Sequence, residues 1–542
     1  MNRQLSFFTL TLAILLSSCG GKAEPEINPE GVANLTAMGV NQGIALTWKA
    51  DEGASSYVIY NGDKVVAETE NTFFTLSFLN NNQSYKVGVA AKKEDKVSNV
   101  TYIFATPNEE KDYDPFLEDL NTGLEKRIGE SKIKKMFTAG NINNDVTNIE
   151  RYKLVLDKMA NGISQTIAYI GGSITVGEKA IVVDKNNHQK GYAYHSYNWL
   201  KEHYDKNQNS KFINASISGT DSSIATVRLE KDVLVNKPNL VFLEFAGNNG
   251  TTEFDKKTYE SLIRRILTQE QKPAVILLFS AANYVQSQVN YMQPMGSYYH
   301  LPMFSMLGAM NQVVSTYDKS DPVFKYFISS DPDDIVHPNA QGHILYAKTL
   351  CYTLKQLYKS QYSQSEYVTP SKPSQNRYDD YVDFTYVNNE YNNEIISSLG
   401  SFEAKETSHR VLKDTADVFA FQKGWKKLNG NANEPMQIHV TCRNFFIIYM
   451  AGNPAINGDP KGKMIASYVD SSDPNKKGSL SWESDRTCKQ ANISTVIDNG
   501  NGWDNPCAMI LLDNEESATY DISIKMENAS NLGTILAFGY SK

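Results

Sequence analysis

A serine that follows two glycines could serve as a nucleophile. Residues 168–177 read AYIGGSITVG, so Ser173 stands where an apolar strand would turn into a helix. The glycines leave room for a substrate carbonyl, and the first N–H groups of a helix have no partner within it. The same turn could cradle a phosphate, but a phosphate-binding loop requires lysine directly after its last glycine, where Glu178 stands instead. The segment therefore favours nucleophilic chemistry over phosphate binding.

A histidine and a carboxylate near residue 337 could activate this serine. The segment DPDDIVHPNAQGH places Asp334 three residues before His337. Within one turn of chain, this spacing lets the carboxylate lie beside the imidazole, fix its tautomer and stabilise its protonated form. Asp331 and Asp333 are competing candidates for the acid. The pair supplies the base and the orienting group that a serine nucleophile requires.

Two further turns could stabilise the oxyanion that forms when a serine attacks an ester. In NASISGT, Gly219 follows a predicted strand and could donate its backbone N–H. In FLEFAGNNG, Asn248 follows another predicted strand and could donate from its carboxamide. Each turn, taken singly, could equally be the structural end of a strand. When such donors lie beside a nucleophile and its base, they form an oxyanion hole, which stabilises the negative charge of the tetrahedral intermediate.

These residues lie in a region that alternates short apolar strands with helices. The predicted strands are TIAYIGG, KFINASISG, NLVFLEFAG, AVILLFSAA and KYFIS, and the predicted helices lie around YHSYNWLKEHY, VRLEKDVLV, YESLIRRILT and MFSMLGAMNQVVSTY. Uninterrupted apolar strands are typical of a parallel sheet covered by helices on both faces. We therefore expect an α/β domain over residues 163–362. Open sheets of this class carry their sites at the carboxyl ends of the strands, where all four candidate groups are expected.

The four blocks GGSIT, NASISGT, FAGNN and DxxHPN, in this order, resemble the SGNH hydrolase family, also called GDSL-like esterases. The resemblance implies a three-layer, flavodoxin-like α/β fold that hydrolyses carboxylic esters with no metal and no organic cofactor. The roles that it implies are nucleophile for Ser173, general base for His337, orienting acid for Asp334, and oxyanion hole for Ser173, Gly219 and Asn248. One departure is Asn249, where the family usually has aspartate, and it leaves the support of Asn248 open.

An antiparallel β-sandwich is expected before this domain. Residues 28–106 alternate apolar and polar positions between turn residues, which predicts short antiparallel strands. Trp48, Tyr57 and Tyr85 in this pattern resemble a fibronectin type III domain, which implies a spacer, with glycan binding as the alternative. Residues 107–162 indicate a helical connector.

A second β-rich region is expected at the carboxyl end. Residues 363–380 are rich in Ser, Pro and Tyr and indicate a linker. Residues 381–542 predict a C-terminal β-sandwich or jelly roll, with carbohydrate binding as a candidate role. In it, Trp503 is a candidate sugar platform, while the acidic stretch 498–504 lacks the spacing of a calcium loop.

The first residues resemble a bacterial lipoprotein signal. Residues 1–18 carry Arg3 and an apolar run too short to span a bilayer, and they end in Leu-Ser-Ser before Cys19. This pattern implies a lipid anchor at Cys19 and a bacterial outer-membrane location facing the periplasm or the cell surface. An ordinary secretory signal is the alternative. Of the other cysteines, Cys351 is expected to be a buried thiol, and one bridge is expected among Cys442, Cys488 and Cys507.

Net charge and domain organisation indicate which kind of substrate the protein acts on. The 542 residues carry a formal net charge of −8, which argues against a nucleic-acid partner. A modular lipoprotein with this esterase-like domain favours an O-acetylated polysaccharide or oligosaccharide as substrate. The alternatives are a general esterase or lipase, a cell-wall O-acetyl esterase, and a catalytically silent glycan-binding lipoprotein. The Tyr-rich segment 284–300 is expected to be a loop that either stacks on sugar rings or packs on the domain.

Overall fold

The computed structural model of the chain describes residues 25–40, 43–107, 128–142, 148–183, 188–360, 367–407, 417–427, 430, 432–451, 463–475, 488–490, 494–498 and 505–542. It divides into two compact units, Met1–Glu110 and Lys111–Lys542. The expected signal segment 1–18 and lipidation site Cys19 lie outside the described residues. Among the helices that are described, none has both the length and the apolar character needed to cross a bilayer.

The first unit consists of two antiparallel sheets around one apolar cluster. One sheet contains β1 (Thr36–Val40), β2 (Gly43–Thr47) and β5 (Phe73–Ser77), and the other contains β3 (Ser56–Asn61), β4 (Lys64–Thr69), β6 (Tyr85–Lys93), β7 (Lys96–Val97) and β8 (Thr101–Ala105). Buried side chains of both sheets meet between them, where the rings of Trp48 and Tyr57 make an edge-to-face contact with centroids 5.2 Å apart. The alternating sequence pattern correctly predicted antiparallel strands here.

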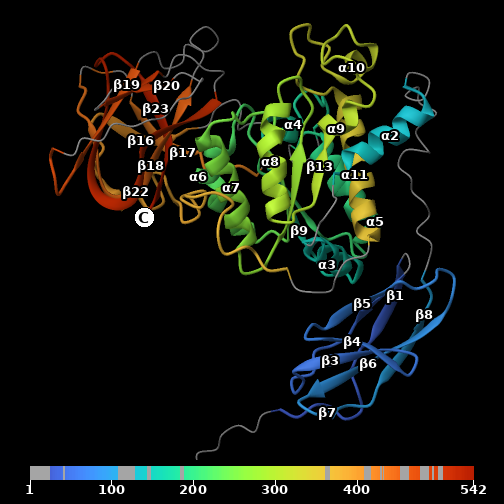
Figure 1. The fold of residues 1–542 in the computed structure, drawn as a ribbon. Coiled ribbons are helices and arrows are strands. Elements are labelled where there is room, and N and C mark those ends of the chain that lie inside the picture. The colour runs from blue at the N-terminus through green and yellow to red at the C-terminus, as the bar shows by residue number, and fades with distance from the viewer. Residues whose placement is uncertain are drawn as a thin grey trace, which may run out of the picture. The chain divides into compact units, whose positions relative to one another are not determined.

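The second unit is built around a five-stranded parallel sheet (Figure 1). Its strands are β9 (Thr166–Gly171), β10 (Lys211–Asn214), β11 (Leu240–Glu244), β12 (Ala274–Phe279) and β13 (Met303–Ser305), in the spatial order β10-β9-β11-β12-β13. The chain places β10 on one side of β9 and β11 on the other. The carboxyl ends of β9 and β11 therefore flank the switch point where sheets of this class bind their ligands.

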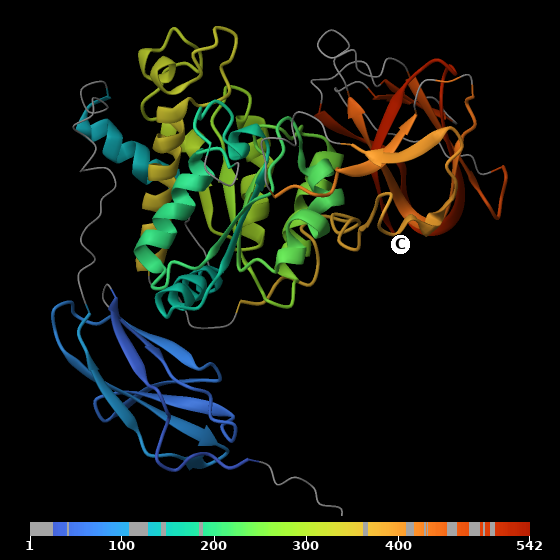
Figure 2. The ribbon, with the colours of Figure 1, turned by 180° about the vertical axis from the view of Figure 1, so that it is seen from behind.

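Helices cover both faces of this sheet, as the apolar strands predicted. Alternate side chains of each strand point to opposite faces, so each face has its own apolar cluster. One cluster joins the sheet to α2 (Glu130–Gly140), α3 (Ile149–Ala160), α5 (Tyr192–Tyr204) and α11 (Ala340–Lys359), and the other joins it to α6 (Ser222–Asp232), α7 (Glu253–Leu267) and α8 (Gln286–Tyr298). Figures 1 and 2 show these layers from two sides. The helices α2 and α3, expected in a connector, thus belong to the layers of this domain.

Two predicted elements of the sheet region are wrong. KYFIS does not form a strand, because Pro322–Phe327 form helix α10, with Pro322 at its start and the Asp321 side chain capping two of its N–H groups. The fifth strand is instead β13, inside the segment predicted as a long helix. The Ser305 side chain caps α9 (Met306–Met310) and so starts this short helix only after the strand. In both places a capping residue decided the structure of an apolar run.

The Tyr-rich segment 284–300 forms helix α8 rather than the expected loop. Its buried residues Gln288, Val289, Met292 and Met295 recur at helical spacing and face the sheet. Pro294 lies inside the helix. Burial of this apolar face therefore outweighs the loop preference of a Pro- and Gly-containing sequence.

The region after residue 380 forms one antiparallel ten-stranded sheet. Its long central strands are β18 (Met436–Ala451) and β22 (Asn505–Met526). The others are β14 (Thr385–Val387), β15 (Ile396–Ser398), β16 (Phe402–Glu406), β17 (Lys423–Lys427), β19 (Lys463–Asp470), β20 (Cys488–Gln490), β21 (Ser494–Asp498) and β23 (Gly533–Ser541). Cys351 is a buried free thiol, as predicted, and Cys442 is one too, so Cys442 takes part in no bridge.

This sheet packs directly on the helices of the parallel-sheet domain rather than being joined to it only by a linker. One of its apolar clusters includes Ile224 and Val227 of α6 together with Phe384 and Phe446. The described part of the expected linker 363–380, residues 367–380, contacts α7, where the Ser261 hydroxyl donates to the Tyr378 carbonyl at 2.8 Å. The two regions therefore share a continuous interior.

A fully buried ion pair lies at this contact. Arg228 and Asp232 of α6 are 3.2 Å apart, and neither side chain reaches solvent. Asp232 also accepts the backbone N–H groups of Phe419 and Ala420, at 2.8 and 3.0 Å. Burial raises the pKa of Asp232 above its usual value, and Arg228 and the two N–H groups offset only part of this rise. Removing one partner of such a pair leaves a buried charge without compensation.

We expect Asp232→Ala to lower the free energy of unfolding by about 3–5 kcal/mol, because Arg228 and two N–H groups lose their acceptor. The matched control is Glu230→Ala, whose side chain is 57% exposed and lies 3.5 Å from Arg265. It should cost less than about 1 kcal/mol. Urea unfolding measures both, and similar losses for the two variants would contradict the assignment.

Candidate active site

The nucleophile candidate Ser173 begins the four-residue helix α4 (Ser173–Val176), directly after β9. Glycine is required at both preceding positions, because atoms of Glu244 and Asn248 lie too close to leave room for a Cβ. A Cβ on Gly172 would lie 1.8 Å from the Asn248 Oδ1, and a Cβ on Gly171 would lie 2.5 Å from the Glu244 carbonyl oxygen. The doublet thus lets the turn sit against the end of β11.

The structure brings Ser173, His337 and Asp334 into one hydrogen-bonded chain. The His337 Nε2 is 2.8 Å from the Ser173 Oγ, and the His337 Nδ1 is 3.0 Å from the Asp334 Oδ2. The tautomer with a proton on Nδ1 satisfies both contacts, since Nδ1 then donates to the carboxylate and Nε2 accepts from the hydroxyl. This is the geometry in which an imidazole removes a proton from a serine.

Asp334 is held as a carboxylate. Burial raises its pKa, but the backbone N–H groups of His337 and Val336 and the charge on His337 outweigh burial, so the pKa lies below its usual value. The Asp334 Oδ1 accepts those two N–H groups at 3.0 and 3.1 Å. The competing candidate Asp331 instead lies 3.9 Å from the Lys179 ammonium. An ionised Asp334 can therefore stabilise the imidazolium.

The loop that carries His337 is clamped to helix α10. The Ser329 N–H donates to the His337 carbonyl at 2.9 Å, and the Asn339 carboxamide donates to the carbonyls of Tyr326 and Ile328, both at 2.9 Å. Asn339 also caps α11 by accepting the Gly342 N–H. Sequence reasoning assigned no role to Asn339, although Asn before a helical pattern is a signal for a cap.

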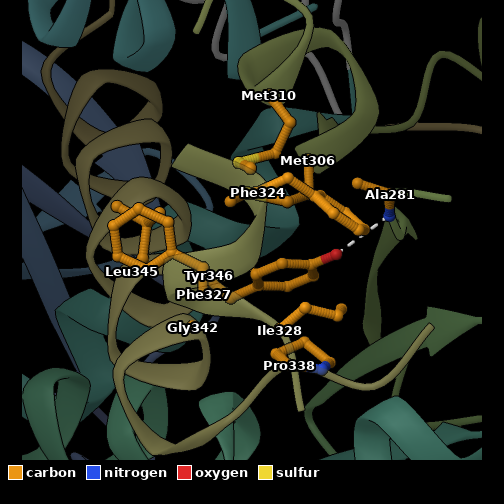
Figure 3. A pocket seen from close by; sticks show the side chains of 10 residues that line it. All are labelled: Ala281, Met306, Met310, Phe324, Phe327, Ile328, Pro338, Gly342, Leu345 and Tyr346. Atoms are coloured by element: carbon orange, nitrogen blue, oxygen red, sulfur yellow. Dashed lines mark hydrogen bonds between the residues drawn. The ribbon is translucent and has the colours of Figure 1, made fainter. Parts of the chain in front are cut away.

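An apolar pocket lies behind this loop (Figure 3). Side chains of α9, α10 and α11 surround Pro338, which directly follows His337, and the Tyr346 hydroxyl accepts the Ala281 N–H at 2.9 Å. Its lining residues are Ala281, Met306, Met310, Phe324, Phe327, Ile328, Pro338, Gly342, Leu345 and Tyr346. The loop that carries His337 is thus packed against apolar side chains on one side, while the His337 imidazole contacts Ser173.

The two oxyanion candidates reach the same edge of the sheet. Gly219 has a φ of +72°, a backbone conformation that favours glycine, and follows β10. Its loop is joined to the nucleophile turn by the Ile217 N–H, which donates to the Gly171 carbonyl at 3.1 Å, and by the Ser218 hydroxyl, which donates to Glu178 at 2.7 Å. The Asn248 side chain lies against Gly172. Three turns therefore surround the space above Ser173.

Asn249 supports the turn of Asn248 as an amide. Its Oδ1 accepts the Ser222 N–H at 2.9 Å, while its Nδ2 donates to the hydroxyls of Ser222 and Tyr291, at 2.8 and 3.0 Å. Burial raises the pKa of nearby Asp255, and the charge of Asp221 adds to that effect. An aspartate at position 249 would add a third carboxylate here, whereas the amide binds without charge.

Glu244, which sequence reasoning missed, lies beneath these turns. It is the last residue of β11, is buried, and has a pKa that burial raises. Its carboxyl group accepts the Thr175 hydroxyl at 3.2 Å and the Gly247 N–H at 3.4 Å. One carboxyl group thus connects the nucleophile helix to the Asn248 turn. A lone acidic residue ending an apolar strand was the available signal.

We expect Glu244→Leu to lower kcat by about 10- to 100-fold with little change in KM, because both turns lose their common acceptor and shift. Glu244→Gln keeps an acceptor oxygen and should retain most of kcat. Steady-state hydrolysis of p-nitrophenyl acetate measures both variants. Equal losses for Leu and Gln would show that the acceptor does not matter.

His343 fixes the other side of the nucleophile helix. Its Nε2 is 2.9 Å from the Glu178 carbonyl oxygen and its Nδ1 is 3.3 Å from the Tyr192 N. Nε2 therefore carries the proton and donates, and Nδ1 accepts the N–H. A second proton on Nδ1 would face this N–H, and burial lowers the pKa of His343 from 6.5 to about 4.

The neutral His343 makes stability depend on pH. Its folded-state pKa is depressed, so the unfolded chain takes up a proton near pH 6.5 that the folded protein takes up only near pH 4. The free energy of unfolding should therefore fall by about 3 kcal/mol as the pH drops across this window. Urea unfolding at several pH values measures this fall, and His343→Gln should make it shallower. An unchanged pH dependence in the variant would overturn the assignment.

Other candidate sites lie partly beyond the described residues. Trp503, the candidate sugar platform, lies outside them, as does most of the acidic stretch 498–504. Within the described residues, no group of three or more His, Cys, Asp or Glu side chains is arranged to hold a metal ion.

In comparisons with known proteins, the model of the GDSL-like Lipase/Acylhydrolase family matches residues 169–345. No curated protein matches the chain. Among solved structures, a two-domain esterase active on acetylated mannans is similar over 75% of this chain and 99% of its own, with 22% identity and a TM-score of 0.56. The same kind of esterase co-crystallised with mannopentaose gives 22% identity, 75% and 98% coverage and a TM-score of 0.54.

A smaller match is a catalytic mutant of an acetylxylan esterase from Geobacillus stearothermophilus. It has 15% identity, covers 35% of this chain and 94% of its own, and has a TM-score of 0.28. The likeness in fold to the two-domain esterase covers 75% of this chain, and so extends beyond the 177 residues that the family model matches.

Proposed function

We propose that this carboxylic ester hydrolase, whose residues 169–345 form a GDSL-like acylhydrolase domain, removes O-acetyl groups from a polysaccharide or oligosaccharide. The observation that carries the proposal is the hydrogen-bonded chain Ser173–His337–Asp334 at the carboxyl edge of the parallel sheet. A serine, a base and an orienting acid in this arrangement are the parts that ester hydrolysis by acyl transfer requires.

The reaction proceeds in two steps. The Ser173 Oγ attacks the ester carbonyl while the His337 Nε2 takes its proton, and Asp334 stabilises the imidazolium. The tetrahedral oxyanion is stabilised by the Ser173 N–H, the Gly219 N–H and the Asn248 carboxamide. His337 then returns the proton to the leaving sugar hydroxyl, which leaves acetyl on Ser173. A water, deprotonated by His337, releases acetate and restores the serine.

The substrate class is supported by fold and by domain order. The esterase active on acetylated mannans is similar in fold to this chain over 75% of this chain's length. This likeness supports an acetylated glycan as the substrate. The lipoprotein-like first residues support attachment through Cys19 to the bacterial outer membrane, where polysaccharides are accessible, with residues 28–106 as a spacer.

We expect Ser173→Ala to lower acetate release from acetylated glycans, and hydrolysis of p-nitrophenyl acetate, by about 10⁴-fold or more, because the nucleophile is removed. Asn248→Ala should lower kcat by about 10²- to 10³-fold, since one oxyanion donor is lost. Acetate release from acetylated xylan, mannan, pectin and peptidoglycan measures the preferred substrate.

The matched control is Ser164→Ala. Ser164 lies just before β9, at the opposite end of the strand from Ser173, and its hydroxyl donates to the Asn209 carbonyl at 2.8 Å. This variant should keep wild-type rates. Wild-type rates in Ser173→Ala would rule out the serine mechanism.

A further inference from the structure

Two groups of exposed apolar side chains flank the candidate active site. One is Ile181–Val183, which follows the nucleophile helix and has Ile181 81% exposed. The other is Tyr284, 42% exposed, which follows β12. Neither group belongs to the proposed catalytic machinery, and apolar surface beside a reaction centre commonly contacts the substrate.

Tyr284 is fixed next to an oxyanion candidate. Its hydroxyl donates to the Gly247 carbonyl at 3.0 Å. Gly247 precedes Asn248, whose side chain contacts Gly172, the neighbour of Ser173. The Tyr284 ring therefore lies beside the carboxyl edge at which the nucleophile is presented, on the β11 side.

The opposite flank carries Ile181–Val183. The segment leaves the nucleophile helix through Glu178, which the Ser218 hydroxyl contacts on the β10 side. Lys179 and Ile181 have φ values of +65° and +76°, which are strained for side chains with a Cβ. The Lys190 N–H donates to the Val182 carbonyl at 2.8 Å and holds this strained backbone. Ser173 thus lies between an aliphatic flank and an aromatic one.

A sugar ring matches the chemistry of the aromatic flank. A pyranose has a face of C–H groups and an edge of hydroxyls, so it can cover an aromatic face while its hydroxyls stay in water. A tyrosine whose hydroxyl is already bonded offers a rigid apolar surface at low entropic cost. A free acetate ester of a small alcohol needs no such surface.

We propose that Tyr284 forms a sugar-binding subsite, in which its ring stacks on a pyranose of the substrate at or next to the residue that carries the acetyl group. The subsite rests on the proposed function and deepens it, since it explains how a glycan ester is preferred over a simple one. The stacking contact is present both in the bound substrate and in the transition state. Its loss should therefore raise KM and change kcat little.

The test compares a glycan with a small ester in the full-length protein. For Tyr284→Ala, we expect kcat/KM on an acetylated manno- or xylopentaose to fall about 10- to 100-fold, mostly through KM, as for other aromatic stacking contacts. The fall on p-nitrophenyl acetate should be at least about tenfold smaller. Tyr284→Leu keeps apolar bulk without the ring and should behave like Tyr284→Ala.

Two further variants separate the ring from its surroundings. Tyr284→Phe keeps the ring and should keep most of the preference for the pentasaccharide over p-nitrophenyl acetate. Tyr298→Ala removes a similarly exposed tyrosine, 39% exposed, whose hydroxyl donates to the Lys372 carbonyl at 3.1 Å. This control should leave the preference unchanged.

The outcomes are distinguishable. If Tyr284→Ala and Tyr284→Leu lose equal factors on both substrates while the wild type deacetylates the pentasaccharide, the subsite is wrong and the proposed function stands. If the wild type hydrolyses p-nitrophenyl acetate but releases acetate from no glycan, the proposed function is wrong, and the subsite falls with it.

Discussion

The hydrogen bond between Ser173 and His337 joins side chains 164 residues apart, and much of the second unit serves to bring them within 2.8 Å. The parallel sheet fixes the serine by ending β9 at a turn that only glycine can form against Asn248. The helix α10 fixes the histidine through the bonds that clamp its loop. A shift of either support would separate the two groups, because an imidazole accepts a hydroxyl proton only over a short distance.

Two buried polar side chains, Glu244 and His343, support the residues around this hydrogen bond, and each has defined hydrogen-bond partners. Glu244 connects the nucleophile helix to the Asn248 turn, and His343 connects it to the start of α5. Buried polar groups are costly unless their hydrogen bonds are satisfied, so such a network permits few alternative arrangements. These buried hydrogen bonds therefore hold the turns of Ser173 and Asn248 in the fixed geometry that preorganised oxyanion donors require.

The C-terminal sheet continues this interior instead of forming a separate module. Its apolar cluster includes side chains of α6, and its loop supplies two N–H groups to Asp232, which pairs with Arg228 at the base of that helix. The helix α6 begins just after the Gly219 turn. The C-terminal sheet thus packs on α6, the helix that follows Gly219 and helps to position this oxyanion candidate. This contact is a physical reason for the two regions to occur together.

The sequence by itself determined the features that depend on near neighbours. Four of the five strands of the parallel sheet, β9 to β12, were predicted from sequence, as were the glycine turn at Ser173 and the three-residue spacing of Asp334 and His337, because each is a local pattern. Tertiary structure decided what depends on remote contacts. Residues 286–298 became a helix through burial, and Pro322–Phe327 became one through the cap at Asp321. Glu244, Asn339 and His343 have remote partners that the sequence around each of them does not identify. Likewise, only folding brought Tyr284 and Ser173 to the same edge of the sheet, since they follow β12 and β9, which both pair with β11.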